Sequence, residues 1–177
     1  MSLFYRSTRD DSVKVTASQA ILKGLAADGG LYVPEQIPAL DKSFEELSKM
    51  SYQEVAYEVM KLMLDDFTEE DSKFDTKVIA PLVKADGAYY LELFHGSTIA
   101  FKDMALSILP HLLITSAKKN NVKNEIVILT ATSGDTGKAA LAGFADVKGT
   151  KIIVFYPKHG VSPIQEKQMV TQKGDNT

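Results

Sequence analysis

The spacing of apolar positions divides the chain into two parts. Over residues 1–80 apolar side chains recur at the three- and four-residue spacing of amphipathic helices. Three helix starts are marked by capping boxes, in which Ser or Thr is followed three residues later by Glu or Gln. The boxes are Thr16 with Gln19, Ser43 with Glu46, and Ser51 with Glu54. The first eighty residues are therefore predicted to be mostly helical.

The longest of these predicted helices carries an apolar stripe that we expect to be buried. Its members are Tyr52, Val55, Ala56, Val59, Met60 and Met63. Such a stripe is far more often core than a ligand site. Between the first two helices, the glycines at 29 and 30 should turn the chain into a short strand over 31–33, which Pro34 ends.

From about residue 76 the pattern changes to strands that alternate with helices. A hairpin is predicted to turn at Asp86-Gly87, with residues 89–94 as its second strand. The helix that follows begins near Phe101 and is apolar nearly all round, which predicts burial. Pro110 should kink this helix, and a lysine pair at 118 and 119 suits its C-terminal end.

Two strand–helix units complete the chain. A strand over 125–130 precedes a helix that ends near residue 145, and the strand KIIVFYP precedes a helix that starts near Ser162-Pro163. This order is typical of an α/β fold with a parallel sheet and flanking helices. Since parallel strands normally lie in the middle of larger sheets, residues 81–177 are predicted to be an incomplete α/β domain, cut within the fold.

Composition narrows the classes of partner and location. The chain is 45% hydrophobic and 24% charged, with a net charge of −3, which is ordinary for a globular protein. No segment concentrates Lys and Arg, so a nucleic-acid partner is not expected, and no apolar run is long enough to predict a membrane span. The absence of cysteine and of a signal-peptide core favours a cytoplasmic location. The oligomeric state is left open.

The segment LFHGSTIAFKDMA places Lys102 in the first turn of the predicted helix. A cation there is disfavoured by roughly 0.3–1 kcal/mol, so the position calls for a reason. One reading is a surface lysine whose charged end reaches water. The other is a buried lysine, because burial among Phe101, Met104 and Ile108 would penalise the charged form. The neighbouring Asp103 carboxylate would instead favour the charged form of the lysine. Only the favourable position of an acidic residue in the first turn of a helix explains Asp103.

A second motif, TATSGDTGKAALAGF, joins a strand to a helix. A P-loop and a dinucleotide fingerprint both need glycine where Thr132 stands, and a nucleophile elbow at Ser133 needs glycine where Asp135 stands. What remains is a loop able to hold a carboxylate or phosphate with hydroxyl and N–H groups. Asp135 would repel such a guest, so we expect it to face a hydroxyl or a cation, or to cap the helix. A plain helix start with Ser133 or Asp135 as N-cap is the alternative.

The histidines show no metal-binding pattern. His95, His111 and His159 lack spacings such as H-E-x-x-H, so no metal is expected. His95 precedes Lys102 closely and is either a pocket residue or a packed loop histidine. His111 is expected in the core, and His159 in a solvated loop.

Taken together, HGSTIAFKD and ATSGDTG resemble threonine synthases, which are pyridoxal-phosphate (PLP) enzymes of the tryptophan-synthase β-subunit type, fold type II. The segments YRSTR and ILKGLAADGGLYVPEQIP also resemble the N-terminal region of that family. The resemblance implies that Lys102 holds the cofactor as a Schiff base and that Asp135 lies near its phenolic oxygen. It implies that the substrate is bound by Ser133, Gly134, Asp135, Thr136 and Gly137.

The resemblance also implies a reaction and a domain organisation. Residues 1–80 would be the N-terminal region and residues 81–177 an incomplete cofactor-binding domain. The whole enzyme would convert O-phospho-L-homoserine, a small phosphorylated amino acid, and water to L-threonine and phosphate in threonine biosynthesis. The fragment alone is expected to be inactive, since the partners of the cofactor phosphate and pyridine nitrogen would come from later sequence.

Two other functions stay open. One is a different lyase of the same fold type, such as a threonine or serine dehydratase, which Asp135 and the first eighty residues disfavour. The other is a homologue that binds a phosphorylated ligand without catalysis, which the presence of Lys102 disfavours.

Overall fold

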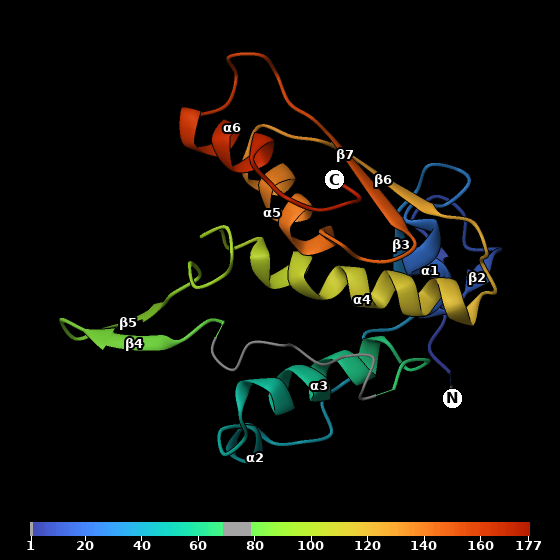
Figure 1. Ribbon diagram of the computed structural model, residues 1–177. Coiled ribbons are helices and arrows are strands. Elements are labelled where there is room, and N and C mark those ends of the chain that lie inside the picture. Colours follow the sequence, from blue (N-terminus) through green and yellow to red (C-terminus); the bar gives the residue numbers. More distant parts are fainter. Residues whose placement is uncertain (1, 69–78) are drawn as a thin grey trace. The chain divides into compact units, whose positions relative to one another are not determined.

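The computed structural model describes residues 2–68 and 79–177 (Figure 1). The chain divides into two compact units. The first unit comprises Met1–Lys77 with His111–Lys123, and the second comprises Val78–Pro110 with Asn124–Thr177. A compact unit is a region of dense contact, whereas a domain must also fold independently. We therefore keep the predicted domain division between residues 80 and 81 as a proposal.

Helices of the first unit begin at the predicted capping boxes. Helix α1 spans Ala17–Lys23, α2 spans Phe44–Leu47 and α3 spans Tyr52–Met63. In each box the hydroxyl of the N-cap residue accepts from the backbone N–H three residues later, and the side chain of that later residue accepts from the N-cap N–H. Two of the four unpaired N–H groups at each helix start are thus satisfied locally, which explains why these starts are readable from the sequence.

The first unit also contains a three-stranded antiparallel sheet in the order β2-β1-β3. Its strands are β1 (Tyr5–Ser7), β2 (Lys14–Val15) and β3 (Tyr32–Pro34). The predicted strand over 31–33 is confirmed with a shift of one residue, since Pro34 is its last member rather than its terminator. Proline is tolerated there because β3 is an edge strand. The other two strands are too short to produce a readable alternation and were not predicted.

The buried stripe predicted for α3 is wrong in this structure. Val59 is 46% exposed and Tyr52 is 37% exposed. Glu58 is instead the buried residue of the helix, and its carboxylate pairs with Lys42 at 3.0 Å and with Lys61 at 2.6 Å. Apolar spacing indicates which residues share a face, but it does not show whether that face is covered.

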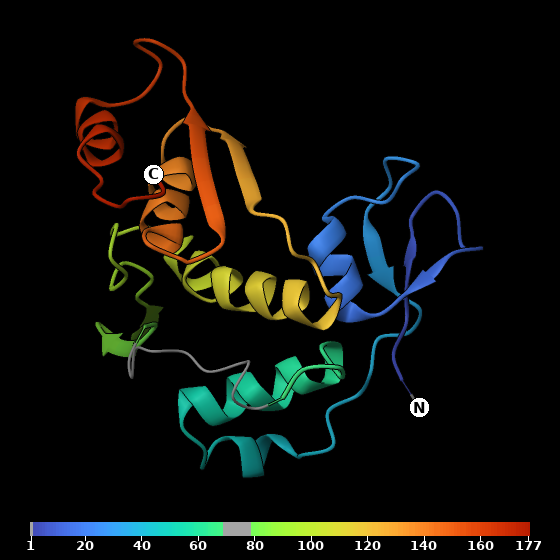
Figure 2. The same ribbon diagram turned by 45° about the vertical axis from the view of Figure 1, so that its right-hand side comes forward.

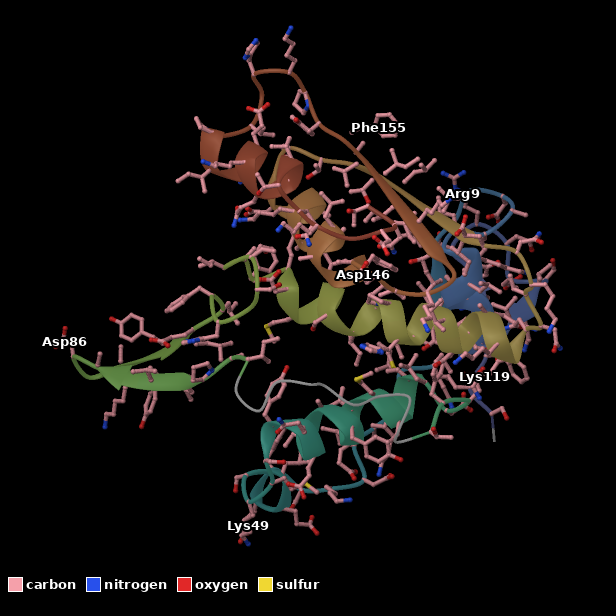
Figure 3. The ribbon with its side chains drawn as sticks, viewed as in Figure 1. Arg9, Lys49, Asp86, Lys119, Asp146 and Phe155 are labelled. Atoms are coloured by element: carbon pink, nitrogen blue, oxygen red, sulfur yellow. The ribbon has the colours of Figure 1, made fainter. Side chains whose placement is uncertain are left out.

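The second unit opens with the predicted hairpin. Strand β4 (Leu82–Ala85) pairs antiparallel with β5 (Ala88–Leu91). Asp86 lies at the tip of this hairpin (Figure 3). Asp86 and Gly87 have φ angles of 47° and 77°. Positive φ at both central residues is the requirement of a type I′ turn, which Asp-Gly meets at little cost. The second strand ends at Leu91, three residues earlier than predicted.

Helix α4 spans Asp103–Lys119 and runs through the boundary between the two units. The lysine pair lies in its last turn, as predicted, and Pro110 lies buried inside it. The kink at Pro110 stays a prediction. Burial all round is wrong, because Leu109 is 37% exposed and His111, which was expected in the core, is exposed.

The predicted strand–helix–strand–helix order is confirmed in the second unit. Its elements are β6 (Ile126–Ala131), α5 (Asp135–Phe144), β7 (Thr150–Phe155) and α6 (Pro163–Val170). Strands β6 and β7 are parallel and in register from Ile126 opposite Thr150 to Ala131 opposite Phe155. Helix α5 packs against one face of this pair (Figures 1 and 2). The fold class is therefore α/β with a parallel sheet and flanking helices.

The other face of the β6–β7 pair is exposed. Apolar side chains alternate outward along both strands, and the four largest are Val127, Leu129, Ile153 and Phe155, each at least 48% exposed. Figure 3 labels Phe155 at the end of β7. Parallel strands are normally covered on both faces. Among the helices of residues 2–68 and 79–177, none is long and apolar enough to cross a membrane.

Candidate active site

Lys102 is the last residue before α4. Its carbonyl oxygen accepts from the N–H of Leu106 at 3.0 Å, so it occupies the N-cap position rather than the first turn predicted from the sequence. Its amine donates to the hydroxyl of Thr136, which lies in the first turn of α5. The folded chain therefore brings the lysine of FKD to the SGDTG loop, across 34 residues of sequence.

Asp103 explains how the HGST loop is held beside Lys102. Its buried carboxylate accepts from the N–H of Thr98 at 2.9 Å and from that residue's hydroxyl at 2.6 Å. A third bond comes from the N–H of Ala100 at 3.3 Å. Gly96 packs so closely that a Cβ there would lie 2.3 Å from the Asp103 Cβ. The sequence suggested only a favourable charge at this position, whereas the structure gives Asp103 a role in shaping the loop.

The predicted burial of Lys102 is only partly correct. Ile108 is buried, but Phe101 is 57% exposed and Met104 is half-buried. The ring of Phe101 lies 5.7 Å from the Lys102 amine, a distance at which an aromatic face attracts a cation. Lys102 itself is half-buried. Apolar neighbours in sequence surround it less than expected, because adjacent residues at a helix start point in different directions.

The SGDTG loop is shaped by a residue that precedes it. The hydroxyl of Thr132 accepts from the N–H of Gly134 at 3.0 Å and from the N–H of Gly137 at 3.1 Å. Gly134 is the N-cap of α5 and makes no side-chain cap, so the alternative with Ser133 or Asp135 as N-cap is wrong. Sequence reasoning missed Thr132. A hydroxyl at a strand end, followed by a glycine-containing turn, is the signal that would have pointed to it.

Asp135, the first residue of α5, faces a cation, one of the arrangements expected from the sequence. Its Oδ1 atom lies 3.0 Å from the amine of Lys138 and accepts from the amide nitrogen of Gln165 at 2.9 Å. These hydrogen bonds, with Gln165 the larger cause, hold the pKa of the Asp135 carboxyl below its ordinary value. The charges of Lys138 and Lys102 act in the same direction.

The remaining predicted positions differ in their surroundings. Ser133 is exposed at the tip of the loop. His95 hydrogen-bonds to Glu92 at 2.7 Å and stacks on Phe94, and it is exposed. His159 lies in an exposed loop with a φ angle of 60°. In the described part of the chain, no group of three or more His, Asp or Glu side chains is placed to hold a metal ion.

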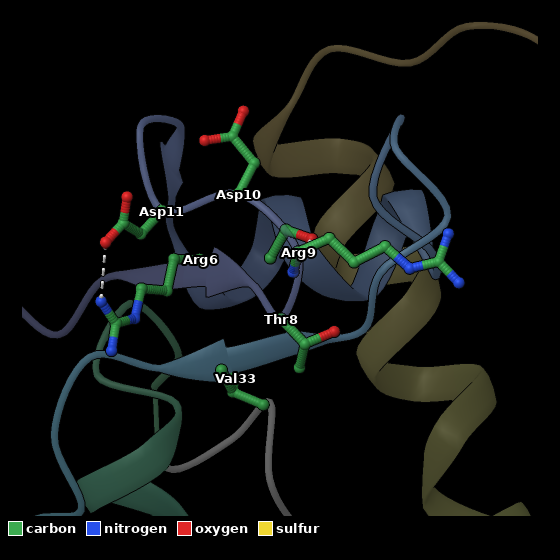
Figure 4. Close-up of a pocket in the computed structure, with 7 residues that line it drawn as sticks. Arg6, Thr8, Arg9, Asp10, Asp11 and Val33 are labelled. Atoms are coloured by element: carbon green, nitrogen blue, oxygen red, sulfur yellow. Dashed lines mark hydrogen bonds and ion pairs between the residues drawn. The ribbon is translucent and has the colours of Figure 1, made fainter.

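The first unit contains a separate hollow, lined by residues of the YRSTR segment and those that follow it (Figure 4). Arg6 pairs there with Asp11 at 3.4 Å, and Arg9 donates to the carbonyl of Asp28 at 2.8 Å. Both guanidinium groups thus already have protein partners. This hollow offers less free charge for a ligand than its two arginines suggest.

Known proteins match the chain along nearly its whole length. Residues 4–75 match the family described as Threonine synthase N terminus. Threonine synthase from Saccharomyces cerevisiae is 37% identical over 99% of this chain, and the enzyme from Pseudomonas aeruginosa is 38% identical over 97%. The chain is thus similar to threonine synthases over nearly its whole length.

Solved structures of threonine synthases have the same fold as this chain. The yeast enzyme matches 99% of the chain with a TM-score of 0.86 at 36% identity, and a PLP-bound threonine synthase from Brucella melitensis matches 95% with a TM-score of 0.80 at 35% identity. The chain spans 39% of the length of the Saccharomyces and Pseudomonas relatives, 39% of the yeast structure and 38% of the Brucella structure.

Proposed function

We propose that this chain is part of a PLP-dependent threonine synthase, a lyase that forms L-threonine and phosphate from O-phospho-L-homoserine and water. The observation that carries the proposal is the contact between the Lys102 amine and the Thr136 hydroxyl. It joins the two motifs on which the family resemblance rests, and relatives that share both the sequence and the fold are threonine synthases. A place in threonine biosynthesis and a cytoplasmic location belong to the same proposal.

The residues around Lys102 suit a Schiff-base lysine. The amine is half-buried and donates to a hydroxyl, and within residues 2–68 and 79–177 it forms no ion pair with a carboxylate. The Asp103 carboxylate is turned away into the HGST loop, where it accepts three hydrogen bonds. An aldehyde reacts with a neutral amine, and a lysine amine is the group that forms such a Schiff base. PLP, when bound, supplies the electron sink for a carbanion at the substrate α-carbon.

Lys102 has a second task in the proposed reaction. With cofactor and substrate bound, the free amine of Lys102 would act as the general base that takes the proton from the substrate α-carbon. Thr136 is positioned to hold that amine in place through its hydroxyl. Proton transfers by the same amine accompany the loss of phosphate from the γ-carbon and the addition of water at the β-carbon.

The loop over 133–137 is the proposed substrate site. Since the N–H groups of Gly134 and Gly137 are bonded to Thr132, these glycines contribute shape. Ser133, Thr136 and the start of α5 are left to meet the substrate carboxylate, which the helix dipole also favours. Asp135 keeps its charge beside Lys138 and is proposed to lie on the phenolic side of the cofactor. The substrate partner is thus a small phosphorylated amino acid.

Reductive labelling tests this proposal directly. The full-length gene product is incubated with PLP, reduced with borohydride, and digested for peptide mapping by mass. Label confined to Lys102, absent from Lys102→Ala and retained in Lys118→Ala, is expected. Lys118 is a suitable control because it lies exposed in the last turn of the same helix. Label scattered over surface lysines would overturn the proposal.

The choice of reaction needs its own assay. Phosphate and threonine released together from O-phosphohomoserine support threonine synthase. Ammonia released from threonine or serine, with O-phosphohomoserine left intact, would identify a dehydratase of the same fold type.

A further inference from the structure

Gln165 connects the candidate substrate loop to the start of α6. Its side-chain oxygen accepts from the N–H of Ser162 at 3.2 Å and from the hydroxyl of that residue at 3.0 Å. Only the oxygen of an amide accepts, so these bonds fix which way the group points. The amide nitrogen is thereby directed at Asp135, to which it donates at 2.9 Å.

The same amide packs against the turn of the loop. A Cβ built on Gly134 would lie 2.5–2.6 Å from the amide atoms of Gln165, so only glycine allows this approach. Gly134 also has a φ angle of 142°, in the region that glycine adopts without strain. Loop and side chain therefore fit together at both the backbone and the carboxylate.

We infer that Gln165 is a positioning residue, which uses one amide group to cap α6 and to hold the Asp135 carboxylate in the substrate loop. The inference rests on the proposed function, because the loop is assigned to substrate there. It adds a contact from α6 to a site otherwise built from the HGST loop, Lys102 and the start of α5. Gln165 acts through Asp135 and is not itself a catalytic residue.

The groups that face Asp135 define what a change at Gln165 does. From α5 comes the ammonium of Lys138, from the residue before α4 the amine of Lys102, and from α6 the neutral amide of Gln165. Replacing the amide by a carboxylate removes the donor and adds a like charge. Both effects disfavour the ionised form of Asp135, so its pKa rises.

Gln165→Glu separates the two tasks of the residue. Glutamate at this third helical position still accepts from the N-cap residue, so the capping box survives while the donation to Asp135 is lost. Gln19→Glu is the matched control, since Gln19 holds the same position in the capping box of α1. Gln165→Met removes the donor without adding charge, and it keeps the test usable should the glutamate variant fold poorly.

The experiment uses the full-length gene product loaded with PLP. Carbon-13 NMR of labelled aspartate, with Asp135→Asn to assign the signal, follows the carboxyl titration. We expect Asp135 to titrate at higher pH in both Gln165 variants and unchanged in Gln19→Glu. The kcat/KM for O-phosphohomoserine should fall roughly 10–100-fold in Gln165→Glu, through KM more than kcat, as expected for one charge-assisted hydrogen bond.

An unchanged Asp135 titration in Gln165→Glu would overturn the inference, and so would an equal effect in Gln19→Glu. Failure of the proposed function has a different signature. In that case the wild-type protein shows no label on Lys102 and forms no threonine, whatever the titration of Asp135.

Discussion

At the scale of residues, the side chains that shape the site are those with several hydrogen bonds. Through the family resemblance the sequence predicted Lys102 and the loop over 133–137 as site residues, and these stay a proposal. Sequence reasoning explained Asp103 only by its position in a first turn, and it missed Thr132. Each accepts hydrogen bonds from backbone N–H groups close in sequence but outside helix or strand pairing. Such bonds depend on how the loop turns, which spacing alone does not reveal.

Asp103→Asn tests the loop-shaping role. The substitution replaces one carboxylate oxygen of Asp103 by an amide NH₂ group, which cannot accept a hydrogen bond. At least one buried donor of Thr98 or Ala100 then loses its acceptor. A loss of roughly 1–3 kcal/mol is expected, measured as a lower thermal midpoint. Asp86→Asn is the control, because Asp86 lies at the hairpin tip with positive φ, which asparagine also adopts. Equal effects of the two substitutions would contradict this role.

At the scale of elements, local sequence signals predicted helix starts and turns correctly, whereas the predictions of buried helix faces were wrong. Capping boxes, the Asp-Gly turn and the strand–helix order were all correct, because each depends on residues that are neighbours in sequence. The covered faces of α3 and α4 were predicted wrongly, because coverage depends on what packs from elsewhere. Glu58 shows this best, since it lies buried on a helix whose apolar spacing pointed to other residues.

Glu58 predicts how α3 responds to acid. Hydrogen bonds from Lys61 and then Lys42 lower the pKa of the Glu58 carboxyl. A lowered folded-state pKa gives stability that is present above the unfolded value, about 4.3, and is lost as the pH falls through the folded value. Glu58→Gln should therefore lower the thermal midpoint at pH 7. Below about pH 4 the thermal midpoints of the variant and the wild type should differ less. Glu45→Gln is the control, because it breaks an exposed ion pair with Lys49. It should change the thermal midpoint little at either pH.

A substitution at Gly143 tests how closely α5 packs on α4. Glycine to alanine within a helix normally stabilises by roughly 0.5–1 kcal/mol. Here a Cβ would lie 2.2 Å from the carbonyl oxygen of Leu106, closer than any tolerated contact. Gly143→Ala should thus lower the thermal midpoint, opposite to helix propensity. Ala142→Gly in the same helix is the control, and it should show only the effect of helix propensity. A higher thermal midpoint for Gly143→Ala would contradict the close packing.

At the scale of the whole molecule, the exposed face of β6 and β7 is the main feature. Leu129 and Ile153 are paired neighbours on it, 67% and 48% exposed. The chain spans 39% of its first relatives, whose remaining residues have no counterpart in these 177. Such a face favours association with other apolar surfaces.

Leu129→Lys tests that face in the 177-residue chain. Binding of a hydrophobic dye and light scattering should both fall. The free energy of unfolding should change by less than about 0.5 kcal/mol, as at other exposed sites, so the thermal midpoint should hardly move. Ile37→Lys is the control, because Ile37 is 86% exposed and lies outside the sheet. Equal reductions by both variants would show that the strand face has no special part.

The sequence by itself determined the resemblance to threonine synthases, the order of elements in the second unit and the positions of helix starts and turns. These follow from motifs and hydrogen bonds between residues a few positions apart, which the chain carries wherever it folds. Tertiary structure alone decided that Lys102 meets Thr136, that Gln165 meets Asp135, and which helix faces are covered. Those contacts join residues about thirty positions apart, and their distances are set by how helices pack on the sheet.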